Sequence, residues 1–479
     1  MKEKFLKALQ SKRKTFVLFL LLSILFRILS FFYGVIDHDE STYLIIANAL
    51  NNGSYLYSDV IDTKPPGIFL AFSTIQLVFG KSIFAIRLFG SFILSLSAFL
   101  LFLISRRFGS TKSISFFSGL TYLVIFSCYR FGLAINTELF FSFFALLGLY
   151  IFQIAEVRNK TSLWFAGGLA IGLGFIFKYV ILAAFAAFCV FFLVEKAFLK
   201  NVTTKILKFT SALFGVALPF LIVHIYFAVN SRFDDFYEII YNVTARYSSE
   251  FSILDSGKFF LNFHVSYLPF LALFYLGLLH KKVSAKTKRI SILWYLFAII
   301  MVILPGKPFK HYYLQLLPAV SLLIPLAMDQ FINAIPVLKN KKGQFIGILL
   351  SITLLIAVIN QSYFWFNKDT TAEIANKLRE HVQPSDRIIA DKNLQLTYYL
   401  LDLSPPSKYV HPTIIFNHSE AFDVSTEEEM NRMLDKNPKF IIYQKSSAYY
   451  ESNKRILRSY HQIDMINKVK ILEIISEVH

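Results

Sequence analysis

The sequence predicts an α-helical integral membrane protein with about eleven transmembrane helices and a small C-terminal α/β domain. Of its 479 residues, 55% are hydrophobic and only 17% are charged, whereas soluble domains carry about 25% charged residues. The apolar residues form runs such as "SIFAIRLFGSFILSLSAFLLFLI", close to the ~20 residues that cross a bilayer. Near residue 363 these runs give way to short helical and strand patterns, which are typical of a soluble domain.

Eleven apolar segments make up the predicted membrane part. The first follows basic residues, as in a signal peptide. It is too long for the apolar core of a signal peptide, however, and no small-residue cleavage site follows it. We therefore expect it to be retained as a helix. The predicted spans are residues 15–36, 83–104, 113–131, 137–155, 162–177, 179–194, 207–229, 258–279, 290–305, 313–335 and 344–362.

The distribution of basic residues predicts the orientation of these spans. Lys and Arg concentrate in alternate loops, such as "SRRFGSTK" and "HKKVSAKTKR", and cytoplasmic loops carry such an excess. We therefore expect a multi-pass protein of the inner or plasma membrane with a cytoplasmic N-terminus. An odd number of spans then places the C-terminal domain outside.

The net charge of +18 does not indicate a nucleic-acid partner. From residue 363 onward the chain holds 15 Lys and Arg against 16 Asp and Glu, so the positive excess belongs to the membrane part. Basic loops on one side of a membrane account for it. Membrane lipids, rather than nucleic acid, are the expected neighbours.

We expect two domains, a transmembrane domain over 1–362 and an extracytoplasmic α/β domain over 363–479. In the second, helical patterns such as "TAEIANKLREHV" and "STEEEMNRMLDKN" alternate with the strand patterns "RIIAD" and "PKFIIYQK". This alternation predicts a mainly parallel sheet. The domain shows neither a Gly-rich phosphate loop nor an evident catalytic cluster.

The first outer loop, about 37–82, carries an acidic cluster at the membrane boundary. Asp37, Asp39 and Glu40 fall within four positions, and "STYLIIANALNNG" follows as a predicted amphipathic helix that begins at Glu40 or Ser41. Such a cluster is often only a solvated face. A carboxylate at the edge of a membrane cavity is also a candidate general base, because partial desolvation raises the pKa of a carboxyl group.

Lys64 lies later in the same loop, within "IDTKPPG". The two prolines after it stiffen the backbone and favour an extended conformation at Lys64. One interpretation is a lysine that reaches lipid headgroups. The other is a fixed cation that binds a lipid phosphate.

Three further outer segments carry charged candidates. Glu138, in "NTELF", reads either as an acidic first turn of a helix or as a second active-site carboxylate. Lys307, Lys310 and His311 lie between spans nine and ten, where they either anchor the interface or neutralise a phosphate. Arg87 and Lys178 are weaker candidates of the same cationic kind.

At these residues the sequence resembles the GT-C class of polyprenyl-phosphate-dependent glycosyltransferases. The similarity is to the protein O-mannosyltransferase-like branch, which includes bacterial aminoarabinose transferases that act on lipid A. It is carried by Asp39-Glu40 followed by Tyr43 and "LIIANAL", by Lys64-Pro65-Pro66, by Arg87, and by "NTEL" and "HYYLQLLP". It covers roughly 15–360 and is most specific in 37–90.

The resemblance implies a transfer reaction and roles for several residues. Asp39 would be the catalytic base, and Lys64 would contact the donor phosphate. From their own positions we expect Glu40 to be the structural partner of Asp39, and Arg87, Lys307, Lys310 and His311 to bind the same phosphate. Glu138 and Tyr43 would belong to the acceptor side. The displacement at the anomeric carbon would be direct and inverting. This branch generally works without a metal, so we expect no cofactor.

The expected donor is a polyprenyl-phosphate-linked sugar, and the expected acceptor is a lipid, a glycan or a protein of the cell envelope. A flippase for lipid-linked sugars is one alternative, although transporters place their sites near the midplane of the membrane. An O-antigen ligase or polymerase is another, although a large outer loop with Arg and His would then be expected. The C-terminal domain does not resemble the β-trefoil of eukaryotic protein mannosyltransferases.

Overall fold

The computed structural model describes residues 11–128, 130–194, 202–247, 253–281, 283–304 and 309–475. The chain divides into two compact units. The first unit comprises residues 1–31, 87–226 and 248–363, and the second comprises 32–86, 227–247 and 364–479. The second unit therefore joins the predicted first outer loop to the C-terminal α/β domain. The expected division into a transmembrane domain over 1–362 and an extracytoplasmic domain over 363–479 stays a prediction.

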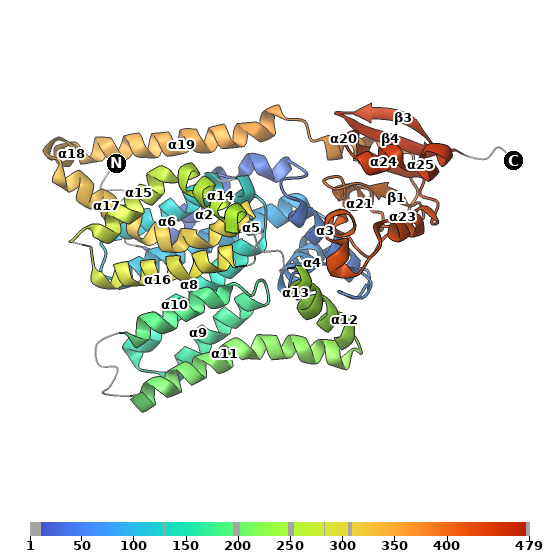
Figure 1. The fold of residues 1–479 in the computed structure, drawn as a ribbon. Coiled ribbons are helices and arrows are strands. Elements are labelled where there is room, and N and C mark those ends of the chain that lie inside the picture. The colour runs from blue at the N-terminus through green and yellow to red at the C-terminus, as the bar shows by residue number, and fades with distance from the viewer. Residues whose placement is uncertain are drawn as a thin grey trace. The chain divides into compact units, whose positions relative to one another are not determined.

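A helix or a pair of helices occupies each of the eleven predicted spans (Figure 1). Short connecting helices are α7 (Arg130–Leu133) and α18 (Pro336–Asn340). The helices of the spans are α2 (Lys12–Leu25) with η1 (Ile28–Phe32), α5 (Ile83–Arg107), α6 (Lys112–Cys128), α8 (Thr137–Arg158), α9 (Thr161–Phe175), α10 (Ile181–Leu193), α11 (Val202–Val229), α14 (Ile253–Ser266) with α15 (Leu268–Leu279), α16 (Ala285–Ile303), η4 (Lys310–Leu316) with α17 (Leu317–Ala334), and α19 (Lys342–Phe366).

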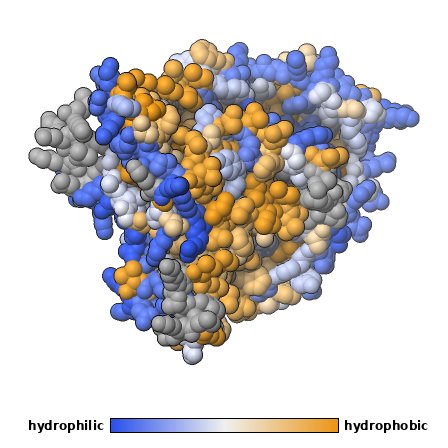
Figure 2. All heavy atoms as spheres, turned by 60° about the vertical axis from the view of Figure 1, so that its left-hand side comes forward, coloured by the Kyte–Doolittle hydropathy of each residue, from blue (hydrophilic) through white to orange (hydrophobic). Residues whose placement is uncertain are grey.

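Four segments of the described chain are long and apolar enough to cross a bilayer by themselves. They are α5, α8, α11 and the continuous η4–α17, and the pair α14–α15, bent by 89°, would be a fifth. Several other helices, including α6, α9 and α10, are apolar but shorter. Hydrophobic side chains cover a broad area of the face shown in Figure 2. Such a surface suits a lipid environment.

Small residues allow α9 and α11 to pack closely within the first unit. A Cβ atom on Gly168 would overlap the carbonyl oxygen of Ala212, and one on Gly215 would overlap that of Phe165. Small residues at such contacts let helix backbones approach each other, which is a main source of packing energy in membranes. The glycines of "AGGLAIG" are therefore explained by packing.

Arg27 lies inside the first predicted span and is fully buried. Its guanidinium donates to the carbonyl oxygens of Gly132 and Leu133 at 2.6 and 2.8 Å. Buried cations in membrane segments are tolerated when backbone carbonyls pair with them. Arg27 thus fastens the turn that leads into α8, and α8 carries Glu138 in its first turn.

In the second unit, the first loop forms α3 (His38–Asn51) and α4 (Gly67–Phe79). The helix α3 begins at His38, before the predicted start at Glu40 or Ser41, because the Asp37 side chain accepts the Asp39 N–H at 3.1 Å and caps the helix. Eight consecutive residues, from Glu40 to Ala47, are buried. The expected amphipathic character is therefore absent over this stretch.

A four-stranded sheet with the order β1-β2-β4-β3 forms the centre of the C-terminal part. The predicted strands are present as β1 (Ile388–Ala390) and β2 (Phe440–Gln444), which pair in parallel. The expectation of a mainly parallel sheet was wrong, since β4 (Val469–Ile474) pairs antiparallel with both β2 and β3 (Tyr460–Ile466). Asn467 and Lys468 join β3 to β4 with φ of 48° and 70°, as a two-residue hairpin turn requires.

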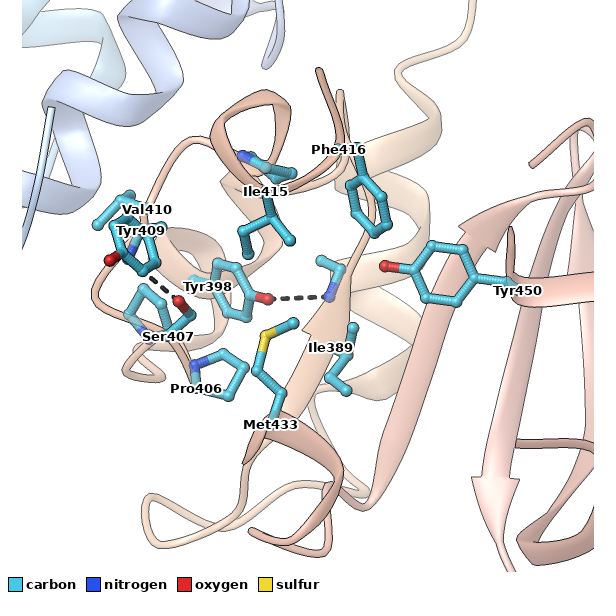
Figure 3. A pocket seen from close by; sticks show the side chains of 13 residues that line it. Ile389, Tyr398, Pro406, Ser407, Tyr409, Val410, Ile415, Phe416, Met433 and Tyr450 are labelled. Atoms are coloured by element: carbon cyan, nitrogen blue, oxygen red, sulfur yellow. Dashed lines mark hydrogen bonds between the residues drawn. The ribbon is translucent and has the colours of Figure 1, made fainter. Parts of the chain in front are cut away.

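Helices cover the sheet and close its core. The two predicted helices are present as α20 (Thr370–Leu378) and α23 (Thr426–Leu434), and α21 (Leu396–Leu401) lies between them in the chain. A cavity of only about 20 Å³ lies among Tyr398, Ile415, Met433 and Tyr450 (Figure 3), so it is too small for a ligand. The remaining helices are α22 (Pro412–Asn417), η5 (Ser419–Phe422), α24 (Ala448–Ser452) and α25 (Lys454–Ser459).

The segment after α11 forms short helices. These are α12 (Phe233–Tyr237), the π-helix η3 (Glu238–Val243) and α13 (Thr244–Tyr247). Tyr57 of the first loop packs its ring against Phe227 and Phe236, with centroids 5.4 and 5.7 Å away. This segment therefore supports the first loop.

Candidate active site

The first loop and the C-terminal part are joined by hydrogen bonds within the second unit. The Ile61 N–H donates to the Lys408 carbonyl at 2.8 Å, and Ile61 forms a parallel bridge with Tyr409. The buried Gln395 donates to the His38 carbonyl at 3.3 Å, at the start of α3. Two elements far apart in the sequence are thus fixed around one cluster of polar side chains.

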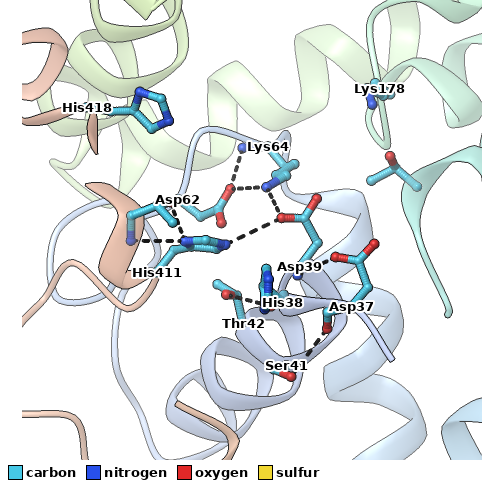
Figure 4. A network of polar contacts seen from close by, with 12 residues as sticks. Asp37, His38, Asp39, Ser41, Thr42, Asp62, Lys64, Lys178, His411 and His418 are labelled. Carbon is cyan, nitrogen blue, oxygen red and sulfur yellow. Dashed lines mark hydrogen bonds and ion pairs between the residues drawn. The ribbon is translucent and has the colours of Figure 1, made fainter. Parts of the chain in front are cut away.

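The centre of this cluster is an ion pair between the two main sequence candidates. Lys64 Nζ lies 3.0 Å from Asp39 Oδ1 and 3.4 Å from Asp62 Oδ1 (Figure 4). The Asp39 and Lys64 side chains are 17% and 21% exposed, so both are reachable but largely enclosed. The structure therefore brings the predicted base and the predicted phosphate-binding cation into direct contact.

Several neighbours fix the position of Lys64. The Tyr57 hydroxyl donates to the Lys64 carbonyl at 2.8 Å, and the Lys64 N–H donates to Asp62 Oδ1 at 3.0 Å. The ammonium lies 5.6 Å from the centre of the Tyr43 ring, in range for a cation–π contact. Pro66 is the N-cap residue of α4. Backbone and ring together hold the cation at the mouth of this helix.

Asp62 is a buried carboxylate to which the sequence argument gave no role. Burial raises the pKa of Asp62 above its usual value of 3.8, and the charge of Lys64 partly opposes this effect. The residue stands two positions before Lys64, in the spacing by which an Asp side chain accepts a nearby backbone N–H. That local pattern was the available signal.

His411, from the C-terminal part, is the second residue that sequence reasoning missed. Its Nε2 lies 3.7 Å from Asp39 Oδ1, and its ring is 6.2 Å from that of His38. Burial, as the largest effect, lowers the pKa of His411 to about 3. No local pattern indicated this placement, because 372 positions of the sequence separate His411 from Asp39.

A second polar cluster lies in the first unit. Lys178 Nζ is 2.5 Å from Glu138 Oε1, and the Glu138 side chain is only 1% exposed. The Thr137 hydroxyl donates to the other carboxylate oxygen at 3.2 Å. The first turn of α8 and the loop that precedes α10 therefore meet at a buried ion pair, which explains the placement of the weaker candidate Lys178.

The segment that begins α17 contributes aromatic and cationic groups to this second cluster. Lys178 Nζ lies 3.8 Å from the centre of the Tyr312 ring. The buried His311 stacks on Phe309, with ring centroids 5.7 Å apart, whereas Lys310 is exposed. Lys307 lies outside the described residues. The phosphate-binding role expected for these residues stays a prediction.

Arg87 and Glu40 are both buried. The Arg87 guanidinium donates to the carbonyl oxygen of Ser30, at the end of the first predicted span. The roles expected for Arg87 and Glu40 stay predictions. Among the described residues no group of three His, Cys, Asp or Glu side chains could hold a metal ion, and the expected independence of metal is likewise untested.

Part of the sequence matches a known family. Residues 63–227 match the model of the family described as dolichyl-phosphate-mannose-protein mannosyltransferase. The matched segment begins one residue before Lys64 and includes Arg87, Glu138 and Lys178. A search of curated proteins finds no match.

The fold is similar to two solved structures of ArnT from Cupriavidus metallidurans. The structure bound to undecaprenyl phosphate is 12% identical, with a TM-score of 0.65, and the comparison covers 96% of this chain and 98% of that one. The apo structure is also 12% identical, with a TM-score of 0.69, and covers 95% and 97%. The family match and these folds confirm the expected resemblance to the GT-C class.

Proposed function

We propose that this chain, a membrane glycosyltransferase of the GT-C class, transfers a sugar from a polyprenyl-phosphate donor to an envelope acceptor outside the membrane. The family match supports a transferase. The similar ArnT was solved with undecaprenyl phosphate, which supports a donor of that chemical kind. The acceptor is a hydroxyl-bearing lipid, glycan or protein.

The observation that carries the proposal is the contact between Asp39 and Lys64. A carboxylate and an ammonium lie 3.0 Å apart in the first outer loop, in a largely enclosed site. Glycosyl transfer from a phosphate needs these two groups together. One must accept a proton from the acceptor hydroxyl, and the other must stabilise the charge of the departing phosphate.

The proposed reaction is a single inverting displacement. The donor phosphate binds Lys64 and thereby frees the Asp39 carboxylate from its ion pair. The acceptor hydroxyl loses its proton to Asp39 while its oxygen forms a bond to the anomeric carbon. The bond between that carbon and the phosphate oxygen breaks, and its electron pair leaves with the phosphate, whose new charge Lys64 stabilises.

The other candidates take supporting roles in this proposal. Tyr43 lies against Lys64 and orients its ammonium, so we now assign it to the donor side. Glu138 pairs with Lys178 and remains the candidate second carboxylate. Arg87, Lys310 and His311 remain candidates for the donor phosphate, and Glu40 for supporting Asp39.

Asp39→Asn tests the proposal. The purified protein is supplied with radiolabelled prenyl-phosphate sugars and envelope lipid extracts, and transfer of label is measured. The substitution keeps the shape of the side chain and removes its basicity, so we expect kcat to fall about 10²- to 10⁴-fold. Asp59→Asn is the matched control, because Asp59 lies in the same loop and binds only the Tyr55 N–H among the described contacts.

Undiminished transfer by Asp39→Asn would refute the assignment of the base. Transfer with retention at the anomeric carbon, measured by NMR of the product, would refute the single displacement. If no donor supports transfer while lipid-linked sugar crosses the bilayer of a proteoliposome, the chain is a flippase instead.

A further inference from the structure

We propose that His411 is a positioning residue for the Asp39 carboxylate, so that the C-terminal α/β part completes the site on the first outer loop. The inference rests on the proposed function, in which Asp39 is the base. It also gives the C-terminal part a role in the chemistry, beyond covering the outer face or binding the acceptor.

The segment that leads to His411 is hydrogen-bonded directly to the first outer loop, which carries Asp39 and Lys64. Ile61 lies one residue before Asp62. Its N–H donates to the Lys408 carbonyl, and it forms a parallel bridge with Tyr409. His411 follows two residues after Tyr409. Main-chain hydrogen bonds fix a segment more firmly than side-chain contacts do, because no side-chain rotamers need to be ordered. The backbone of the segment that carries His411 is therefore fixed beside the first outer loop.

The local structure fixes which nitrogen of His411 carries the proton. His411 is the N-cap residue of α22, and its Nδ1 accepts the Thr413 N–H at 3.3 Å, with the Thr413 hydroxyl 2.6 Å away. A nitrogen that accepts a backbone N–H has no proton of its own. In the neutral ring the proton is then on Nε2, which is the nitrogen that faces Asp39 (Figure 4).

His411 is neutral at pH 7, because burial lowers the pKa of its ring to about 3. Its side chain is buried, and Lys64, His38 and His418 all oppose a positive charge there, while Asp39 alone among its neighbours favours one. A neutral N–H donor can restrain a carboxylate without supplying a full opposing charge. Lys64, by contrast, supplies a full positive charge. Asp39 therefore keeps the negative charge that a base needs.

The two donors of Asp39 differ in what happens when the substrate binds. Lys64 and His411 both approach Oδ1, at 3.0 and 3.7 Å. A donor phosphate competes for the ammonium of Lys64 but not for a neutral imidazole N–H that already faces a carboxylate. As the carboxylate turns away from Lys64, the longer contact to Nε2 can shorten to a hydrogen bond. His411 then holds the base in place during the reaction.

Two substitutions separate this role from that of a helix cap. His411→Asn keeps an acceptor near the position of Nδ1 and removes the Nε2 donor. His411→Gln keeps an amide donor near the position of Nε2 and weakens the cap. We expect His411→Asn to retain the melting temperature and lose about tenfold or more in kcat with KM for the donor little changed. We expect His411→Gln to melt earlier and retain more of kcat.

The pH profile supplies a readout that a purely structural role would not change. A hydrogen-bond donor favours the charged form of a carboxylate, so its removal favours protonation. The acid limb of kcat/KM is therefore expected at higher pH in His411→Asn than in the wild type. The groups that face His411, namely Asp39, Lys64, His38 and His418, are unchanged in this comparison.

A measurement without turnover keeps this inference apart from the proposed function. Carbodiimide modifies protonated carboxyl groups. The extent of Asp39 labelling, measured by peptide mass spectrometry at a series of pH values, therefore reports the protonation of this carboxyl group. We expect the labelling midpoint to move to higher pH in His411→Asn. If the wild type transfers no sugar but the midpoint moves, the positioning contact stands and the proposed function fails. If His411→Asn matches the wild type in kcat and in midpoint, His411 is only a cap.

Discussion

The buried pair of Glu138 and Lys178 gives a prediction whose size follows from the structure. Lys178→Met removes the cation that lies 2.5 Å from Glu138 and leaves a carboxylate that is 1% exposed. Breaking a buried ion pair from one side costs about 3–5 kcal/mol, because the remaining charge has neither partner nor water. The Thr137 hydroxyl still donates to the remaining carboxylate.

The opposite substitution is expected to cost less. Glu138→Gln leaves an ammonium that is 16% exposed and rests on the Tyr312 ring. A lysine retains its cation–π contact and some water in this position, and the amide oxygen of Gln still accepts a hydrogen bond. The double variant removes both charges, so it should be more stable than Lys178→Met alone. We expect a coupling energy of at least about 2 kcal/mol.

The assay is the free energy of unfolding in detergent, measured for the two single variants and the double variant. The pair of Lys342 and Asp329 is the matched control, because it has the same 2.5 Å separation but side chains that are 39% and 22% exposed. Lys342→Met should cost no more than about 1 kcal/mol. Additive effects of Lys178→Met and Glu138→Gln, or equal costs at the two pairs, would refute the reasoning.

Two other predictions concern stability. Gly168→Ala places a Cβ against the Ala212 carbonyl, which forces α9 away from α11 and should cost about 1–3 kcal/mol of unfolding free energy. In the control Gly347→Ala, in α19, the new Cβ meets no atom within 4 Å and should not destabilise the protein. Equal melting temperatures of the two variants would contradict the proposed packing. Because the pKa of Asp62 is raised, its stability contribution is present below pH 3.8 and is lost as pH rises through the folded-state pKa. Asp62→Asn should therefore gain melting temperature over the wild type at pH 7 and little at pH 3.5, and the reverse order would contradict this.

The sequence by itself determined the elements whose physical cause is local. Runs of apolar residues predicted the spans, and the structure has a helix or a pair of helices at each one. The thickness of the bilayer determines the length and the composition of such runs. The pattern of "RIIAD" and "PKFIIYQK" predicted β1 and β2. The hairpin of β3 and β4 was missed, although the turn at Asn467 and Lys468 lies between alternating residues. The prediction of a mainly parallel sheet was therefore wrong, because it extended the parallel pairing of β1 and β2 to the whole sheet.

The sequence also identified Asp39 and Lys64 as candidate site residues, since both lie in the first outer loop and two prolines follow Lys64. It could not identify Asp37 as the cap of α3 or Asp62 as a buried carboxylate beside Lys64. Both assignments depend on which atoms face each other across a turn. A spacing of two residues allows such a contact but does not require it.

Only the tertiary structure decided what surrounds the pair. It brought His411 to Asp39 through a main-chain bridge between Ile61 and Tyr409, and it brought Lys178 to Glu138 across two loops. Contacts of this kind join residues that are tens to hundreds of positions apart, and no periodicity encodes them. Local patterns settle which segments fold as helices and strands, whereas the charge, tautomer and exposure of a site depend on which distant segments enclose it.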